Sequence, residues 1–348
     1  RRLLDHELCL SIKHIVTTGC GDSHMAAVAT ELAFEQLAGI PTEPLNAMTA
    51  ARYHLVGRRS SFPRNPLVIG ISASGTVART REAVGVGQES GGTTLALTAN
   101  PSSPLGTLAE IVLDCSVPEY PHAPGVISYR VSMIALFLIA IRLAEVHAKI
   151  TQEEATVLRQ QLAATGNAVG ATIQACRANV IDVVKATRDH KNFVFVGDGP
   201  NYATALFGAA KLLESAGRHA MGQDTEEWAH LQYFASADID TPTFVISPSA
   251  RGHNRCAEIM APMKRVGRYS VGIIPAGDEV VGSQVDVVLP VVGSTPEIFS
   301  PIVYPTATEL FAAYYADEIG EKFFRGFEGA YDDDDANTIR TSSVLSRD

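Results

Sequence analysis

Three residue types that carry acid–base chemistry occur close together in the second half of this 348-residue chain. Lys211 and Glu214 are three positions apart in a helix-forming stretch, so they share one helix face. His230 follows nineteen positions after Lys211. A carboxylate and an imidazole can both exchange protons with a substrate near neutral pH. The three residues therefore predict an acid–base site, with a surface ion pair and a structural histidine as the alternatives.

The composition of the helix around Lys211 favours the chemical interpretation. Most of its residues are apolar, in the runs 205–207, 209–210 and 212–213. A helix with so much apolar surface has little of it facing solvent. An exposed Lys–Glu pair would also add only about 0.2–0.5 kcal/mol to the stability of the helix.

Hydroxyl-bearing residues gather in three loops of the first half, each ahead of a helix-like stretch. The hydroxyl-bearing candidates for substrate binding are Ser23, Ser72, Ser74, Thr76 and Ser128, and Val126 lies in the third loop, two residues before Ser128. Hydroxyl groups and free N–H groups at a helix start bind phosphate well, because the helix dipole also favours negative charge there. The alternative for each loop is an ordinary Ser/Thr helix cap.

A duplicated pattern of strands and helices must position these residues. Four apolar, β-branched runs start 53, 27 and 17 residues apart in the first half, and four more start 50, 28 and 14 residues apart in the second. The predicted strands are residues 14–18, 67–71, 94–98, 111–114, 193–196, 243–246, 271–274 and 285–289. In both halves a Gly-x-Gly follows the first strand, and Ala-Gly ends the next helix at Gly39 and Gly217.

Strands that alternate with helices predict an α/β fold with parallel sheets and helices on both faces. The polar stretch 151–188 between the two copies is interpreted as a pair of linking helices. A dinucleotide-binding function is a weak alternative, because neither Gly-x-Gly turn continues to the third glycine of the fingerprint.

The three hydroxyl loops resemble those of the sugar isomerase (SIS) domain family, in the double form found in the isomerase half of glucosamine-6-phosphate synthase. The Lys-x-x-Glu motif and the nineteen-residue spacing to His230 are similar as well. The resemblance implies two tandem SIS domains, residues 9–150 and 189–331, each a flavodoxin-like three-layer sandwich. It implies further that Glu214 is the proton-transfer base and that His230, supplied across a homodimer, opens the sugar ring.

The resemblance extends to residues 332–348, which are similar to a tail that closes over the sugar. Arg340 stands near the place of an imine-forming lysine, and Ala73 and Val77 replace a glutamine and a threonine of the synthase loops. We expect a phosphosugar aldose–ketose isomerase or an amino-sugar phosphate deaminase or deglycase. A non-catalytic phosphosugar sensor is the alternative. Glutaminase activity is not expected, because the chain starts directly at the first SIS copy.

Composition limits the other classes of function. The net charge of −10 argues against nucleic acid as a partner. The longest apolar run, residues 131–141, predicts a buried helix rather than a membrane span. Five widely spaced cysteines and the absence of a secretory signal indicate a reducing cytoplasm. We expect no metal and no cofactor.

Overall fold

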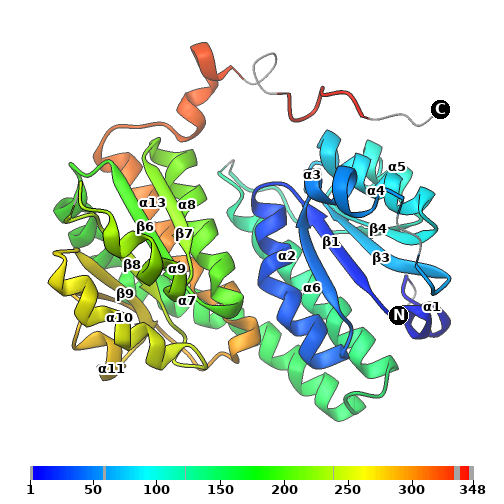
Figure 1. Cartoon of the computed structure of the whole chain (residues 1–348), viewed down its shortest axis with the longest axis horizontal. Helices are drawn as coiled ribbons and strands as arrows, with labels where there is room; N and C mark the ends of the chain where they lie inside the picture. Colours follow the sequence, from blue (N-terminus) through cyan, green and yellow to red (C-terminus); the bar gives the residue numbers. More distant parts are fainter. Residues whose placement is uncertain (1–2, 58–59, 122, 238, 333–337, 345–348) are drawn as a thin grey trace. The chain divides into compact units, whose positions relative to one another are not determined.

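Ten strands form two five-stranded parallel sheets, one in each half of the chain (Figure 1). The computed structural model describes residues 3–57, 60–121, 123–237, 239–332 and 338–344. The chain divides into unit 1, residues 1–160 with 332–348, and unit 2, residues 161–331. Helix α7 begins in unit 1 and ends in unit 2.

The sheet of unit 1 has the strand order β2-β1-β3-β4-β5. Its strands are β1 (Ile15–Gly19), β2 (Thr42–Asn46), β3 (Arg64–Ile71), β4 (Gly92–Thr98) and β5 (Ile111–Asp114). The helices are α1 (His6–Ser11), α2 (Asp22–Ala33), α3 (Ala47–Thr49), α4 (Ala78–Glu89), α5 (Pro104–Leu108) and α6 (Val126–Val146). In Figure 1, α2 and α6 lie on one side of the sheet and α3, α4 and α5 on the other.

The sheet of unit 2 has the order β10-β9-β8-β6-β7, which repeats the order of unit 1 when the strands are numbered from β6. Its strands are β6 (Asn192–Gly197), β7 (His219–Gln223), β8 (Thr243–Ile246), β9 (Ser270–Pro275) and β10 (Val287–Val291). The helices are α7 (Gln152–Thr187), α8 (Tyr202–Ala216), α9 (Thr225–His230), α10 (His253–Arg265), α11 (Glu279–Gly282), α12 (Ser300–Val303) and α13 (Pro305–Glu318). This order is that of flavodoxin-like folds, so the predicted duplication and fold class are confirmed.

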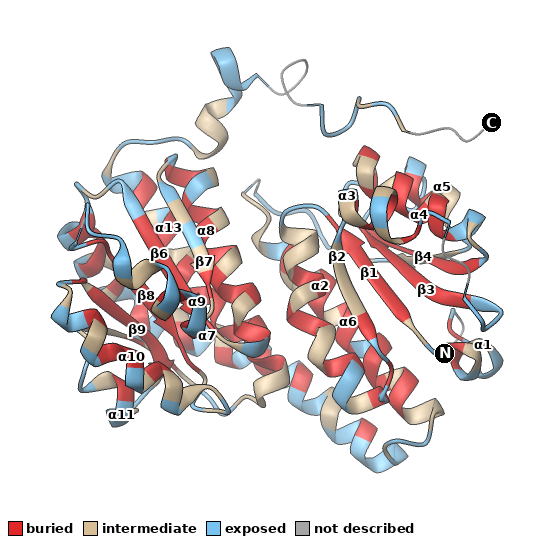
Figure 2. Cartoon of the chain, in the orientation of Figure 1, coloured by how far each residue is buried: buried red, intermediate tan, exposed pale blue. Residues whose placement is uncertain are grey.

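Strand β6 shows how one sheet holds two helix layers in place. Phe193 and Phe195 pack in a core with residues of α7, α8 and α13. The alternate residues Val194 and Val196 pack in a second core with residues of α9, α10 and α11. Successive side chains of a strand point to opposite faces, so one apolar run serves both layers. In Figure 2 the inner strands β1, β3, β4, β6, β8 and β9 are almost entirely buried, whereas the edge strands β2 and β7 are only partly buried.

Two strands and one linker differ from the sequence-based expectation. Strands β2 and β7 were not predicted, because they are short edge strands with mixed burial and contain Pro44 and Gly222. The linker 151–188 is one 36-residue helix, α7, rather than a helix pair. Gly166 and Gly170 lie inside α7 without ending it.

Helix α6 contains the apolar run 131–141 and extends it to 21 residues. Among the described residues it is the one helix whose length and composition would suit a membrane span. More than half of its most apolar window, 56%, is buried in the structure, as in the core helix of a water-soluble domain.

Candidate functional site

The first loop of the candidate site leaves β1 by a turn that only glycine permits. A Cβ atom on Gly19 would lie 2.6 Å from the Cβ atom of Ser23 and 3.0 Å from the carbonyl oxygen of Ile71. The end of β1, the start of α2 and the end of β3 therefore lie within van der Waals contact. Ser23 is thus placed beside the strand end from which the second loop leaves.

The second loop, residues 72–77, is a hydrogen-bonded turn ahead of α4. The N–H of Gly75 donates to the hydroxyl of Ser72 at 3.1 Å, and Ser72 is buried. The hydroxyls of Ser74 and Thr76 lie 2.9 Å apart, with Ser74 exposed. Gly75 has a φ of 67°, and a Cβ there would collide with the Ser103 hydroxyl. Ser72 thus shapes the turn, while Ser74 is available to a ligand.

The second and third loops meet at a small cavity of about 40 Å³. Ala73 lines it from the second loop, and Ser128 lines it from the first turn of α6. Gly125 precedes α6 with a φ of 43°, and its carbonyl oxygen accepts a hydrogen bond from the Ser128 hydroxyl at 3.1 Å. Val126, the first residue of α6, is half-buried. The second and third loops therefore line one cavity, and among the described residues none from the first loop is part of its wall.

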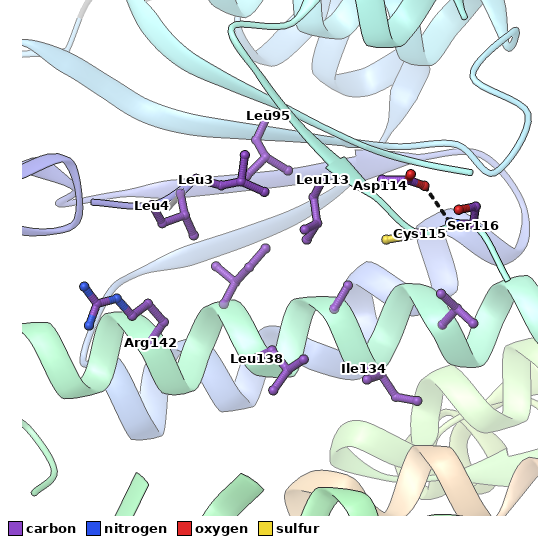
Figure 3. A pocket seen from close by; sticks show the side chains of 13 residues that line it. Leu3, Leu4, Leu95, Leu113, Asp114, Cys115, Ser116, Ile134, Leu138 and Arg142 are labelled. Carbon is purple, nitrogen blue, oxygen red and sulfur yellow. Dashed lines mark hydrogen bonds between the residues drawn. The ribbon is translucent and has the colours of Figure 1, made fainter. Parts of the chain in front are cut away.

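A larger, mostly apolar cavity of about 530 Å³ shares two wall residues, Cys115 and Val131, with the small one. Figure 3 shows Leu95 and Leu113 on the strand side and Ile134 and Leu138 on α6. Burial raises the pKa of Cys115 to about 11, so its thiol is neutral at physiological pH. A neutral thiol is a weak nucleophile, and Cys115 serves as part of the wall.

The C-terminal segment 338–344 lies against the first turn of α4. The N–H of Ala78 donates to the carbonyl oxygen of Ile339 at 2.9 Å. The Arg79 guanidinium donates to the Ser342 hydroxyl at 3.2 Å and to the carbonyl oxygen of Ser343. Arg340 is exposed on this segment. Residues 333–337 and 345–348 of the predicted tail lie outside the described residues.

Arg79 is a functional candidate that sequence reasoning missed. The buried carboxylate of Glu82 accepts hydrogen bonds from Arg79 and, at 3.0 Å, from Arg52. A cation in the first turn of a helix opposes the helix dipole. Arg79 lies three residues after Thr76, and an arginine at this helix position was the signal in the sequence for a role beyond helix formation.

In unit 2 the structure brings Lys211 and Glu214 together. The Lys211 ammonium lies 2.5 Å from a Glu214 carboxylate oxygen. The Lys211 side chain is 3% exposed and the Glu214 side chain 28%. The ammonium also lies 4.8 Å from the centre of the Phe207 ring, within cation–π range. This is an anchored pair with a buried cation and an accessible carboxylate, unlike a surface ion pair.

His230 ends the short helix α9 and points to solvent, with 76% of its side chain exposed. Its ion partner is Glu226, one turn earlier and 3.9 Å away. The next residues also expose apolar side chains, Leu231 at 55% and Phe234 at 72%. The structure thus leaves His230 on the surface of unit 2, beside Glu226 and next in sequence to an exposed leucine.

The edge of the second sheet that corresponds to the phosphate loops is filled by the chain's own side chains. The Ser247 hydroxyl lies 2.9 Å from His253 Nδ1, and His253 Nε2 lies 3.1 Å from an Asp278 oxygen. Asp198 accepts hydrogen bonds of 3.0 Å from the N–H and the hydroxyl of Thr225, and burial raises its pKa. Two acidic groups at this edge oppose the binding of a phosphate there.

Residues 10–142 match the family described as SIS domain. These residues form a SIS domain. The second half repeats its strand order, so the SIS fold occurs twice in tandem.

Comparisons with known proteins cover most of the chain. A glutamine–fructose-6-phosphate aminotransferase (isomerizing) from Gloeobacter violaceus is 29% identical over 318 residues, which are 90% of this chain and 50% of the relative. The chain spans about half the length of the curated relatives it matches.

Two solved structures share the tandem SIS fold. The C-terminal domain of glucosamine-fructose-6-phosphate aminotransferase from Francisella tularensis has a TM-score of 0.82 at 19% identity, covering 90% of this chain and 87% of that one. A glucosamine-6-phosphate deaminase from Thermotoga maritima has a TM-score of 0.67 at 16% identity, covering 89% and 87%. At these identities the likeness shows the fold alone.

Proposed function

We propose that this chain converts phosphosugars, as an aldose–ketose isomerase or an amino-sugar phosphate deaminase or deglycase. The observation that carries the proposal is the buried Lys211 ammonium 2.5 Å from the accessible Glu214 carboxylate. A general base must be held in place and be reachable by its substrate, and the Glu214 carboxylate is anchored by Lys211 while remaining accessible. All five cysteines are free thiols, which supports a reducing cytoplasm as the compartment.

The roles divide between the two SIS units. In the proposed reaction His230 transfers the proton that opens the sugar ring, and Glu214 then moves a proton between C1 and C2. Lys211 holds Glu214 in place and balances its charge. Ser23, Ser74, Thr76 and the N-terminus of α4 hold the phosphate, with Ser72 shaping the turn.

The proposed partner is a second copy of the chain. His230 lies on a surface where Leu231 and Phe234 are exposed, and exposed apolar side chains that lie together mark association sites. In such a homodimer His230 of one subunit serves the Glu214 of the other.

The test is a turnover screen by NMR over fructose-6-phosphate, glucosamine-6-phosphate and fructosamine-6-phosphates. Unphosphorylated sugars are the controls for phosphate recognition. We expect one phosphosugar to be converted, and Glu214→Gln to lower kcat by about 10²–10⁴-fold, the range for a positioned general base.

Glu318 offers a matched control. Its side chain is 31% exposed, close to the 28% of Glu214, and it also pairs with a cation, Arg188, at 3.2 Å. Glu318→Gln should leave turnover within about twofold of wild type. If phosphosugars bind but wild type converts none of them, the chain is a phosphosugar sensor rather than this enzyme. Normal turnover by Glu214→Gln would instead show that Glu214 is not the base.

A further inference from the structure

Residues 324–327 form a left-handed turn just after the last long helix of unit 2. The φ angles are 48° at Phe324, 53° at Arg325, 68° at Gly326 and 54° at Phe327. Left-handed backbone is costly for every residue except glycine, and three of these four residues carry large side chains. Backbone strain of this kind persists where the surrounding contacts require it, often at functional sites.

The turn directs the Arg325 side chain onto the end of α8. The guanidinium donates to the main-chain carbonyl oxygen of Glu214 at 2.7 Å. Arg325 Nε lies 3.4 Å from a Glu321 carboxylate oxygen and donates to the carbonyl oxygen of Lys322 at 3.3 Å. The Arg325 side chain is only 18% exposed, so the guanidinium is held from several sides.

The end of α8 is shaped to receive this guanidinium. Gly217 follows the helix with a φ of 62°, and its N–H donates to the carbonyl oxygen of Leu213 at 3.1 Å. A Cβ atom on Gly217 would lie 2.1 Å from Arg325 Nη1. Glycine is therefore favoured at this position by the left-handed backbone, and any other residue would have to displace the Arg325 guanidinium.

We propose that Arg325 is a positioning residue for Glu214. The inference rests on the proposed function, in which Glu214 is the base. The last turn of a helix frays unless its free carbonyl groups find partners, and Glu214 lies in that last turn. Lys211 fixes the carboxylate end of Glu214, and Arg325 fixes its main chain.

Two pairs of variants test the role of Arg325 in turnover of the phosphosugar that wild type converts. Arg325→Ala should lower kcat by about tenfold to a hundredfold, because small misplacements of a catalytic group have effects of that size. KM should stay within about twofold, since Arg325 touches no substrate in the proposal. Added guanidinium ion should restore part of kcat to Arg325→Ala. The control Arg188→Ala, which removes an exposed Arg–Glu pair elsewhere in unit 2, should keep wild-type kcat and show no such rescue.

The second pair separates the loss of Arg325 contact from backbone strain. Gly217 and Gly320 both have positive φ, 62° and 71°, but a Cβ on Gly320 would meet no atom within 4 Å. Gly217→Ala should displace Arg325 and lower kcat as Arg325→Ala does, whereas Gly320→Ala should not. Because both changes remove the same contact, combining Gly217→Ala with Arg325→Ala should lower kcat no further than Arg325→Ala alone.

Amide hydrogen exchange of the peptide that contains Glu214 tests the same inference without a substrate. Exchange in residues 212–216 should be faster in Arg325→Ala and in Gly217→Ala than in wild type and Gly320→Ala. If wild type converts no phosphosugar, the proposed function fails while this measurement still decides whether Arg325 holds Glu214. Unchanged exchange in both variants, or a kcat of Arg325→Ala within about twofold of wild type, would overturn the inference.

Discussion

The N–H of Ala78 donates to the carbonyl oxygen of Ile339 at 2.9 Å, which joins the C-terminal segment to the first turn of α4. The same turn follows directly on Thr76 of the candidate phosphate loop. Arg79 adds hydrogen bonds to Ser342 and Ser343. The candidate phosphate loop and the C-terminal segment are therefore both attached to the first turn of α4.

Replacing Arg79 should loosen the C-terminal segment. Arg79→Met removes, besides its hydrogen bond to Glu82, the two hydrogen bonds that Arg79 donates to the C-terminal segment, and hydrogen bonds from a charged donor contribute about 1.5–3 kcal/mol each. Cleavage by trypsin after Arg340 should become at least about tenfold faster, because proteolysis follows the population of the open segment. Arg81→Met, two residues further along α4, is the control. Equal cleavage rates in the two variants would show that Arg79 does not hold the segment.

The two loop serines should differ in what they do. Ser74→Ala should raise KM for the phosphosugar with a smaller loss in kcat, as expected when uniform binding is removed. Ser72→Ala removes the hydroxyl partner of the Gly75 N–H, which keeps the Ser72 carbonyl oxygen at 3.0 Å, so it should also lower the free energy of unfolding by about 0.5–1.5 kcal/mol. Steady-state kinetics and urea unfolding measure both effects. Binding unchanged in the double variant would remove this loop from the site.

Mixing two inactive variants tests whether His230 acts across a dimer. Glu214→Gln and His230→Ala should each lose activity alone. If each site takes Glu214 from one chain and His230 from the other, a mixed dimer contains one intact site and regains up to half of the activity. Sedimentation measures the dimer directly. A fully active 37.1 kDa species at all concentrations would contradict the dimer proposal.

His24 should make stability depend on pH. Burial lowers its pKa from 6.5, and Nδ1 has no hydrogen-bond partner among the described residues. Below about pH 6.5 the unfolded chain binds a proton that the folded His24 resists, so stability falls as the pH drops through this range. His24→Gln should reduce that fall in urea unfolding between about pH 8 and pH 5. The exposed control His219→Gln should leave it unchanged, and equal slopes in all three proteins would refute the assignment.

Part of this structure could be predicted from the local sequence alone. Gly39 and Gly217 ended helices as expected, since left-handed caps favour glycine. The Lys211–Glu214 pair followed from helix periodicity. Strands β2 and β7 were missed because edge strands need few apolar residues. Arg79 and Arg325 were missed because their partners, Ser343 and Glu214, lie more than a hundred residues away in the chain. The contacts themselves leave no local pattern, and the one local signal was the position of Arg79 in the first turn of a helix.

The filled edge of the second sheet makes the two halves of the duplication unequal. Ser247, His253 and Asp278 satisfy one another where the first half leaves Ser74 open. Under the proposed function, a change in the loops at residues 72–77 or 125–128 would alter the ligand without touching the stretch that holds Glu214 and His230. Sugar preference and reaction type would then be encoded in separate segments of the gene, so a descendant could acquire a new sugar while it inherits the old chemistry.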